Sequence, residues 1–357
     1  VEVMLPIGIS FFTFQKLSYV IDVYRGETTA LRDPLAFALY VAMFPQLIAG
    51  PIVRFQTIRG QLHERRETWD RFYRGTVRIG WGLAKKILIA ETCGRFADTI
   101  FALAPAMLDT KTAWLGAVAY TLQIYFDFSG YSDMAIGLGL LFGFVLPENF
   151  NRPYSAVSIT DFWRRWHMSL SRWFRDYLYI PLGGNRRGAA RACLNMVVVF
   201  MLCGLWHGAN WTFLAWGMFH GLFLIIERVS GLRRVPVHRW VITRRTVTLL
   251  IVMVGWVLFR AVDVGQAIAF LSAMFTWHDL PLAYDLSLRF NPWDTGILLG
   301  AAAVFLLPHD FSGFRSVVAS AHPRPTVAAV LLLLVVVPLC GFLIISSPAT
   351  PFIYFRF

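Results

Sequence analysis

Long apolar segments follow one another along the whole chain, with short polar stretches between them. About 20 apolar residues in a helix span the roughly 30 Å hydrocarbon core of a bilayer. Strands of a membrane barrel would instead alternate apolar and polar residues, and that period does not dominate here. The pattern therefore predicts an all-α polytopic integral membrane protein. The clearest segments are residues 112–146, 193–226, 246–262 and 325–347.

Other apolar segments carry polar or helix-breaking residues. We expect crossings here as well, because polar groups at membrane depth usually face the interior of a helix bundle or a cavity. The glycines of residues 112–146 predict a break at Gly130 and close helix packing through Gly139 and Gly143. The further predicted spans are residues 4–24, 34–53 (broken at Pro45, Gly50 and Pro51), 75–104 and 294–308.

One apolar segment contains two histidines. Residues 193–226 are long enough for two short spans or a re-entrant pair with a bend near Trp206–Asn210, and they include His207 and His220. An ionisable side chain inside the hydrocarbon is costly, and it is read as functional by default. A lone histidine on an apolar helix can equally be a core residue, and the segment alone does not decide between these interpretations. For His220 we favour the structural one.

Residues 147–192 are the least lipid-like part of the chain. Within them, Thr160–Leu178 has an apolar stripe at helical spacing and arginines on the other side, which predicts an amphipathic helix in the membrane interface with His167 at the border of the two faces. The stripe consists of Phe162, Trp163, Trp166, Leu170, Trp173, Phe174 and Tyr177. We interpret Arg164, Arg165, Arg172 and Arg175 as lipid-headgroup contacts rather than as phosphate ligands.

Charge is scarce and unevenly distributed. Only 15% of the residues are charged, and the formal net charge is +12. A basic balance can indicate nucleic-acid binding, but in a membrane protein it more simply marks cytoplasmic loops. This assigns loops 54–74, 147–192 and 228–245 to the cytoplasm. Loops 25–33, 105–113 and 263–293, which are poor in Lys and Arg, are assigned to the outside.

Most classes of reaction lack the motif that they need. The four cysteines show no CxxC spacing, and no HExxH or Cys/His cluster indicates a metal site. The sequence also contains no GxSxG, Walker A or GxGxxG motif. Histidine acid–base chemistry in a membrane cavity remains, since a neutral imidazole can take the proton of a hydroxyl that attacks an acyl group. Gln123, Asp127 and Asp133 either bond between helices or line such a cavity.

Several motifs together resemble the membrane-bound O-acyltransferase family. The closest likeness is to its bacterial branch, which includes the membrane subunit of alginate O-acetyltransferase and the D-alanyl transfer protein of teichoic acids. The resemblance covers essentially all 357 residues of one transmembrane domain, and it implies that about a hundred N-terminal residues of a full member precede them. The motifs are Asp161-Phe-Trp-Arg-Arg-Trp-His167-Met-Ser-Leu-Ser171, Leu205-Trp206-His207-Gly208, Gly8-Ile-Ser-Phe-Phe-Thr-Phe14, Phe44-Pro-Gln-Leu-Ile-Ala-Gly-Pro51, Tyr125-Phe-Asp-Phe-Ser-Gly-Tyr-Ser-Asp133, Pro147-Glu-Asn-Phe-Asn-Arg-Pro153 and an aromatic tail, 351–357, with Arg356 where Gln is expected.

This resemblance implies a fold and an activity. The fold is a ring of tilted transmembrane helices with interfacial helices around a central tunnel. His207 would be the catalytic base or acid, and His167 would be required or would support it. A cytoplasmic donor, acetyl-CoA, would supply an acetyl group to an extracytoplasmic polysaccharide such as alginate. The resemblance further implies a periplasmic acetyltransferase partner, the bacterial inner membrane, no bound cofactor or metal and no nucleic acid. D-alanyl transfer to teichoic acid, or a non-catalytic polysaccharide exporter, are the alternatives.

Overall fold

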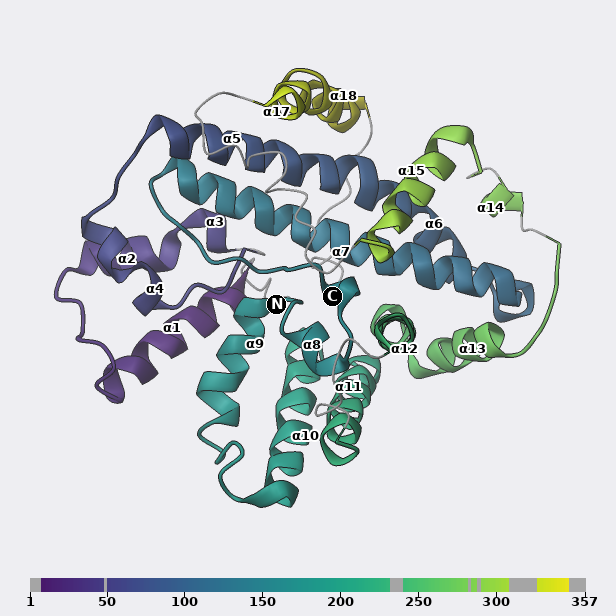
Figure 1. Ribbon diagram of the computed structural model, residues 1–357, viewed down its shortest axis with the longest axis horizontal. Coiled ribbons are helices and arrows are strands. Elements are labelled where there is room, and N and C mark those ends of the chain that lie inside the picture. Colours follow the sequence, from purple (N-terminus) through teal and green to yellow (C-terminus); the bar gives the residue numbers. More distant parts are fainter. Residues whose placement is uncertain are drawn as a thin grey trace, which may run out of the picture.

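Helices make up the regular structure of the chain. The computed structural model describes residues 8–47, 50–231, 240–281, 284–287, 290–307 and 326–346, and these contain no strand (Figure 1). Within these ranges, four helical segments are long and apolar enough to cross a membrane. The predicted all-α polytopic membrane fold is confirmed. The four segments are α10 (Gly188–His207), α11 (Trp211–Val229), α12 (Val241–Arg260) and the continuous segment Val327–Ser346.

Two long helical segments pack side by side through the centre of the molecule. α5 (Trp69–Ala84) continues through a π-helical turn, η1 (Lys85–Ala90), into α6 (Glu91–Phe101), and this segment follows α7 (Thr110–Leu141) (Figure 1). Asp109 begins α7, where its Oδ1 accepts a hydrogen bond from the third helical N–H at 2.8 Å. A π-helical turn changes the direction of the side chains that follow it. The charged side chains described below lie at this pair of helices.

Glycine residues allow α5 and α7 to approach closely. A Cβ atom at Gly82 would overlap the backbone carbonyl of Gly130, so neither position has room for a side chain. α7 runs through Gly130 without interruption. The predicted break at this residue is wrong, because its glycine serves helix packing. Gly143 lies beyond the end of α7 with φ of +77°, so it turns the chain after the helix.

The N-terminal part consists of shorter helices than expected. α1 (Ile9–Tyr24) is followed by α2 (Pro34–Ala42), α3 (Phe44–Leu47) and α4 (Phe55–His63). α2 has 9 residues, and at 1.5 Å per residue it is about 14 Å long, less than half of the hydrocarbon thickness. The prediction of one span over residues 34–53 is therefore wrong. The chain leaves the helix at Met43, two residues before Pro45.

Hydrogen bonds also correct one part of the predicted membrane topology. Arg59 donates from Nη1 to Thr28 Oγ1 at 3.3 Å and from Nη2 to Thr29 Oγ1 at 2.7 Å. Loop 25–33 therefore contacts the basic segment 54–74. Their assignment to opposite sides of the membrane is wrong, because groups on the two sides would be separated by about 30 Å of hydrocarbon.

The amphipathic segment is not one helix. It divides into α8 (Ile159–Trp163), α9 (Met168–Phe174) and a π-helical turn, η4 (Arg175–Tyr179). The prediction of a continuous helix over Thr160–Leu178 is wrong, because α8 ends at Trp163 and His167, with φ of +41°, keeps the chain out of the right-handed helix until α9 begins. Most of the apolar stripe is buried in the protein core, so this face of the stretch packs against other helices of the protein and not against lipid.

The rest of the chain surrounds these elements. α10 and α11 form a hairpin, and α12 is viewed end-on beside them in Figure 1. α17 and α18 lie over α5, where Ala329 and Leu332 pack against Val77. The tail 351–357 lies outside the described residues. The remaining helices are α13 (Val264–Phe275), α14 (Tyr284–Ser287), α15 (Pro292–Ala302), α17 (Val327–Leu331) and α18 (Val337–Ser346).

Candidate active site

The bend between α10 and α11 places the first predicted histidine. His207 is the last residue of α10, and Gly208 follows it with an extended backbone. The Asn210 side chain caps α11, and its Nδ2 donates to the Val262 carbonyl at 2.8 Å. The predicted bend near Trp206–Asn210 is confirmed. It holds His207 at the end of a helix that is long enough to span a membrane.

Aromatic rings surround the His207 imidazole. The ring centroids of Trp206, Trp216 and Phe259 lie 4.8, 5.1 and 5.0 Å from that of His207, each at a steep angle. Edge-to-face contacts of this kind are favourable, and they restrict the rotation of the ring. The imidazole is therefore held in an apolar environment.

The second predicted histidine lies at the break between α8 and α9. His167 is 2% exposed and adopts a left-handed backbone conformation. Such a conformation costs of the order of 1 kcal/mol for a non-glycine residue, and it persists only where the surroundings hold it. Here the ring of Phe128 lies across the imidazole with centroids 4.7 Å apart. The break turns the His167 side chain into the core.

The two ring nitrogens of His167 differ in their surroundings. Nδ1 lies 3.1 Å from Oδ1 of Asn149. Nε2 is buried and has no hydrogen-bond partner among the residues that the structure describes. A buried polar atom without a partner calls for an explanation.

One small cavity brings the two histidines together. It has a volume of about 20 Å³, and its walls are otherwise mostly aromatic. This is the space of about one water-sized group. Because the histidines come from separate motifs, their meeting at one cavity satisfies the first geometric requirement of the predicted chemistry. The lining residues are His167 and His207 together with Ile124, Phe128, Trp163, Trp166, Leu170, Trp216, Trp256 and Phe259.

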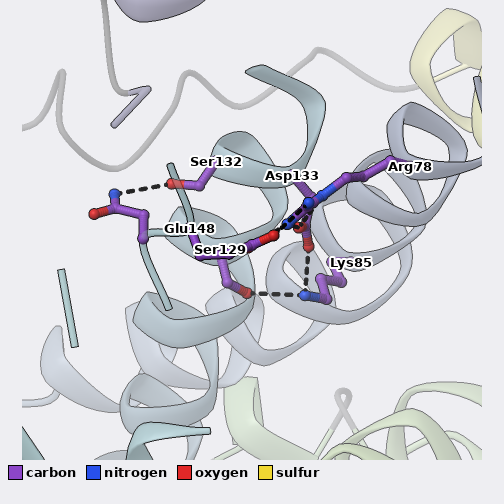
Figure 2. Close-up of polar contacts among 7 residues, drawn as sticks. Arg78, Lys85, Ser129, Ser132, Asp133 and Glu148 are labelled. Carbon is purple, nitrogen blue, oxygen red and sulfur yellow. Dashed lines mark hydrogen bonds and ion pairs between the residues drawn. The ribbon is translucent and has the colours of Figure 1, made fainter. Parts of the chain in front are cut away.

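A second, much larger cavity has a volume of about 1180 Å³, and Asn149 and Met168 are among the residues that line it. A charged cluster forms part of its wall (Figure 2). Asp133 on α7 accepts hydrogen bonds from Arg78 Nη2 at 2.9 Å and from Lys85 Nζ at 2.7 Å.

Glu148 completes this cluster, because its Oε1 accepts a hydrogen bond from Arg78 Nη1 at 2.6 Å. Two cations and two carboxylates are thus paired at the cavity wall. Arg74 and Arg152 line the same cavity and add further positive charge.

The structure shows which of the polar residues discussed above line a cavity and which have structural contacts instead. Asp133 lines the large cavity, whereas Asp127 pairs with Lys86 at 2.7 Å and lies outside both cavity linings. His220 is fully buried among aromatic rings and lines neither cavity, in agreement with the structural interpretation. The four arginines of the amphipathic segment also lie outside the lining of the large cavity.

Sequence reasoning missed the residues that support the site. Arg78 lies in none of the motifs, although an arginine in an apolar helix is a signal of pairing. Asn149 and Glu148 belong to the motif Pro147-Glu-Asn-Phe-Asn-Arg-Pro153, whose residues received no individual role. Their functions depend on contacts with distant parts of the chain, which the spacing of a motif does not reveal.

Comparison with known proteins gives consistent matches. A model of the membrane-bound O-acyltransferase family matches residues 10–262. The chain is 48% identical over 324 residues to a probable alginate O-acetylase of Pseudomonas putida, which covers 91% of the chain and 65% of that protein. It is 38% identical over 317 residues to a peptidoglycan O-acetyltransferase of Helicobacter pylori, covering 79% of the chain and 59% of the relative.

A more distant relative transfers a different group. The chain is 29% identical over 269 residues to a teichoic acid D-alanyltransferase of Bacillus subtilis, covering 70% of the chain and 65% of that protein. The chain spans less than two thirds of the length of each of these three relatives.

Proposed function

The chain belongs to the membrane-bound O-acyltransferase family, and we propose that it is an O-acetyltransferase of the bacterial inner membrane. In this proposal, an acetyl group moves from cytoplasmic acetyl-CoA to an extracytoplasmic polysaccharide such as alginate. The observation that carries the proposal is the small cavity at which His167 and His207 meet. We assign His207 as the general base and then general acid, and His167 as the assisting group.

The reaction is an acyl transfer between a thioester and a hydroxyl. His207 takes the hydroxyl proton while the hydroxyl oxygen bonds to the acetyl carbonyl carbon. The carbon–sulfur bond then breaks, and the thiolate receives that proton from His207. The products are an acetyl ester and a free thiol, and the histidine returns to its neutral form. Aromatic walls support this step because they exclude water, which would otherwise compete as the acceptor.

The large cavity supports the entry of the donor. Its volume of about 1180 Å³ is suited to a large ligand, and its lining includes Met168 and Asn149, which are the chain neighbour and the hydrogen-bond partner of His167. Arg74 and Arg152 on its wall provide positive charge of the kind that phosphate groups require. No resident cofactor is needed for this chemistry, since acetyl-CoA is consumed as a substrate.

The names of the relatives support the acceptor and the group transferred. The alginate and peptidoglycan relatives are O-acetylating proteins, and both are more similar to the chain than the D-alanyltransferase is. We therefore propose acetyl rather than D-alanyl transfer. A periplasmic acetyltransferase that passes the group on to the polysaccharide is the proposed partner.

Replacing His207 tests this function in cells that produce the polymer. We expect His207→Ala and His207→Gln to abolish O-acetylation of the polysaccharide while the protein remains in the membrane at the wild-type level. His278→Ala is the matched control, because His278 is also a histidine but is exposed and does not line the small cavity. The measurements are the acetyl content of the isolated polymer and the amount of protein in the membrane fraction.

The same cells distinguish the alternatives. Polymer that is exported without acetyl groups in a deletion strain excludes an exporter, whereas loss of export supports one. D-alanine esters on the polymer would replace the acetyl assignment. A folded His207→Ala protein that still acetylates the polymer would contradict the assigned mechanism.

A further inference from the structure

The orientation of the Asn149 side-chain amide is settled by a backbone donor. The Ser169 backbone N–H lies 3.2 Å from the Asn149 side-chain atom assigned as Oδ1. A backbone N–H can only donate, so the atom that faces it must be the oxygen and cannot be the NH₂ group. On the opposite side of the amide, Nδ2 donates to Ser132 Oγ at 3.2 Å.

This orientation determines which nitrogen of His167 carries a proton. Nδ1 lies 3.1 Å from the same Asn149 oxygen, which is an acceptor, so Nδ1 must be the donor. The Ser169 hydroxyl, 3.5 Å from Nδ1, offers no alternative proton because it donates to Asn149 Oδ1 at 2.8 Å. It also accepts the Ile52 N–H at 2.9 Å. A neutral imidazole protonated at Nδ1 has its lone pair at Nε2.

Other parts of the chain hold Asn149 in place. Its backbone carbonyl accepts a hydrogen bond from the Met168 N–H at 2.9 Å, directly next to His167. The preceding residue, Glu148, is bound by Arg78 of α5 in the charged cluster of Figure 2. Asn149 is 1% exposed. It therefore lies in a fixed position between the large cavity, which it lines, and His167, which lines the small one.

We propose that Asn149 is a positioning residue that holds His167 in the Nδ1–H tautomer, so that Nε2 meets the acceptor hydroxyl as a hydrogen-bond acceptor. The Nδ1 edge of the ring is occupied by Asn149, which leaves the unpartnered Nε2 edge for the cavity. Because a hydroxyl carries one proton, the O–H that binds Nε2 before the reaction must turn to His207, which then removes the proton as the oxygen attacks. This inference rests on the proposed acetyl transfer for its meaning in catalysis, but the tautomer can be measured without any reaction.

Nuclear magnetic resonance of the full-length protein with ¹⁵N-labelled histidine measures the tautomer directly. The signals of His167 are identified by their loss in His167→Gln. We expect the wild type to show a protonated Nδ1 and an unprotonated Nε2 at this residue. In Asn149→Ala the Nδ1–H signature should be lost, whereas Asn149→Asp, which keeps an acceptor oxygen, should retain it. Ser132 can turn its hydroxyl to donate to the new carboxylate. Asn185→Ala, on an exposed loop, is the control.

Turnover of acetyl-CoA by the same purified proteins provides the second measurement. Asn149→Ala should lower kcat by about 10-fold or more, within the roughly 10²–10⁴-fold that a positioned acid–base group supplies. KM for acetyl-CoA should change little, and Asn149→Asp should recover much of kcat.

The outcomes separate the two proposals. A wild-type His167 protonated at Nε2 overturns the positioning role, and so does an Asn149→Ala protein with unchanged tautomer and kcat. A wild-type protein that shows the Nδ1–H form but does not consume acetyl-CoA overturns the proposed function instead.

Discussion

At the scale of single residues, the site combines two imidazoles in aromatic surroundings with a cluster of paired charges. The histidines face aromatic rings, whereas the ions lie one layer away, where Asp133 joins Arg78 and Lys85. The side chains of these three residues are at most 13% exposed. Removing one member of a buried ion pair leaves its partners unpaired in a medium of low dielectric constant, which costs far more than the loss of a surface pair.

The shared carboxylate therefore gives a test of stability. We expect Asp133→Asn to destabilise the protein by about 3–5 kcal/mol, because two buried cations lose their common partner. Asp70→Asn is the control: it breaks an exposed pair with Arg74 at 3.4 Å and should cost no more than about 0.5 kcal/mol. Thermal unfolding of the detergent-solubilised proteins measures both. Equal midpoints for the two variants would contradict the role assigned to this cluster.

At the scale of elements, the sequence predicts the existence of most helices but not their interruptions. The spans over α10, α11 and α12 follow from length and hydropathy alone. The break at His167 could not be predicted, because the apolar period of Thr160–Leu178 continues through it. It depends on tertiary contacts, above all those of Asn149. Likewise, a glycine such as Gly130 has the same appearance in a sequence whether it ends a helix or packs against another.

Close packing of α5 on α7 predicts a strong effect at one glycine. We expect Gly82→Val to destabilise the protein by at least about 1–3 kcal/mol, because its side chain must displace the backbone of Gly130. Gly60→Ala in α4 is the matched control: a Cβ atom there meets nothing within 4 Å. Alanine is the better helix former, so this change should be neutral or stabilising by up to about 1 kcal/mol. A Gly82→Val protein that melts like the wild type would exclude the close contact.

At the scale of the whole molecule, side-chain hydrogen bonds sort the loops into two groups. Arg54 pairs with Asp176 at 2.7 Å, and Arg228 donates to Asn185 at 2.8 Å, which joins the basic loops to one another. Thr110 bonds to the carbonyl of Thr276 at 2.7 Å, which joins two loops of the opposite group. Counting basic residues predicts this division correctly except at 25–33, a short loop with Arg25 and Arg32 whose charge is too small to decide.

The two groups of loops predict the outcome of labelling from each side of the membrane. Cysteine at Glu27 and at Asn185 should react with a membrane-impermeant thiol reagent from the same side, and cysteine at His278 should react from the other. The reason is that loop 25–33 is bonded to the segment of Arg54, which in turn contacts Asp176. α10, α11 and α12 cross between the two groups. The protein with only its native cysteines supplies the background, since three of the four are buried. Labelling of Glu27→Cys together with His278→Cys would restore the assignment based on charge, and it would contradict the contacts of the N-terminal helices.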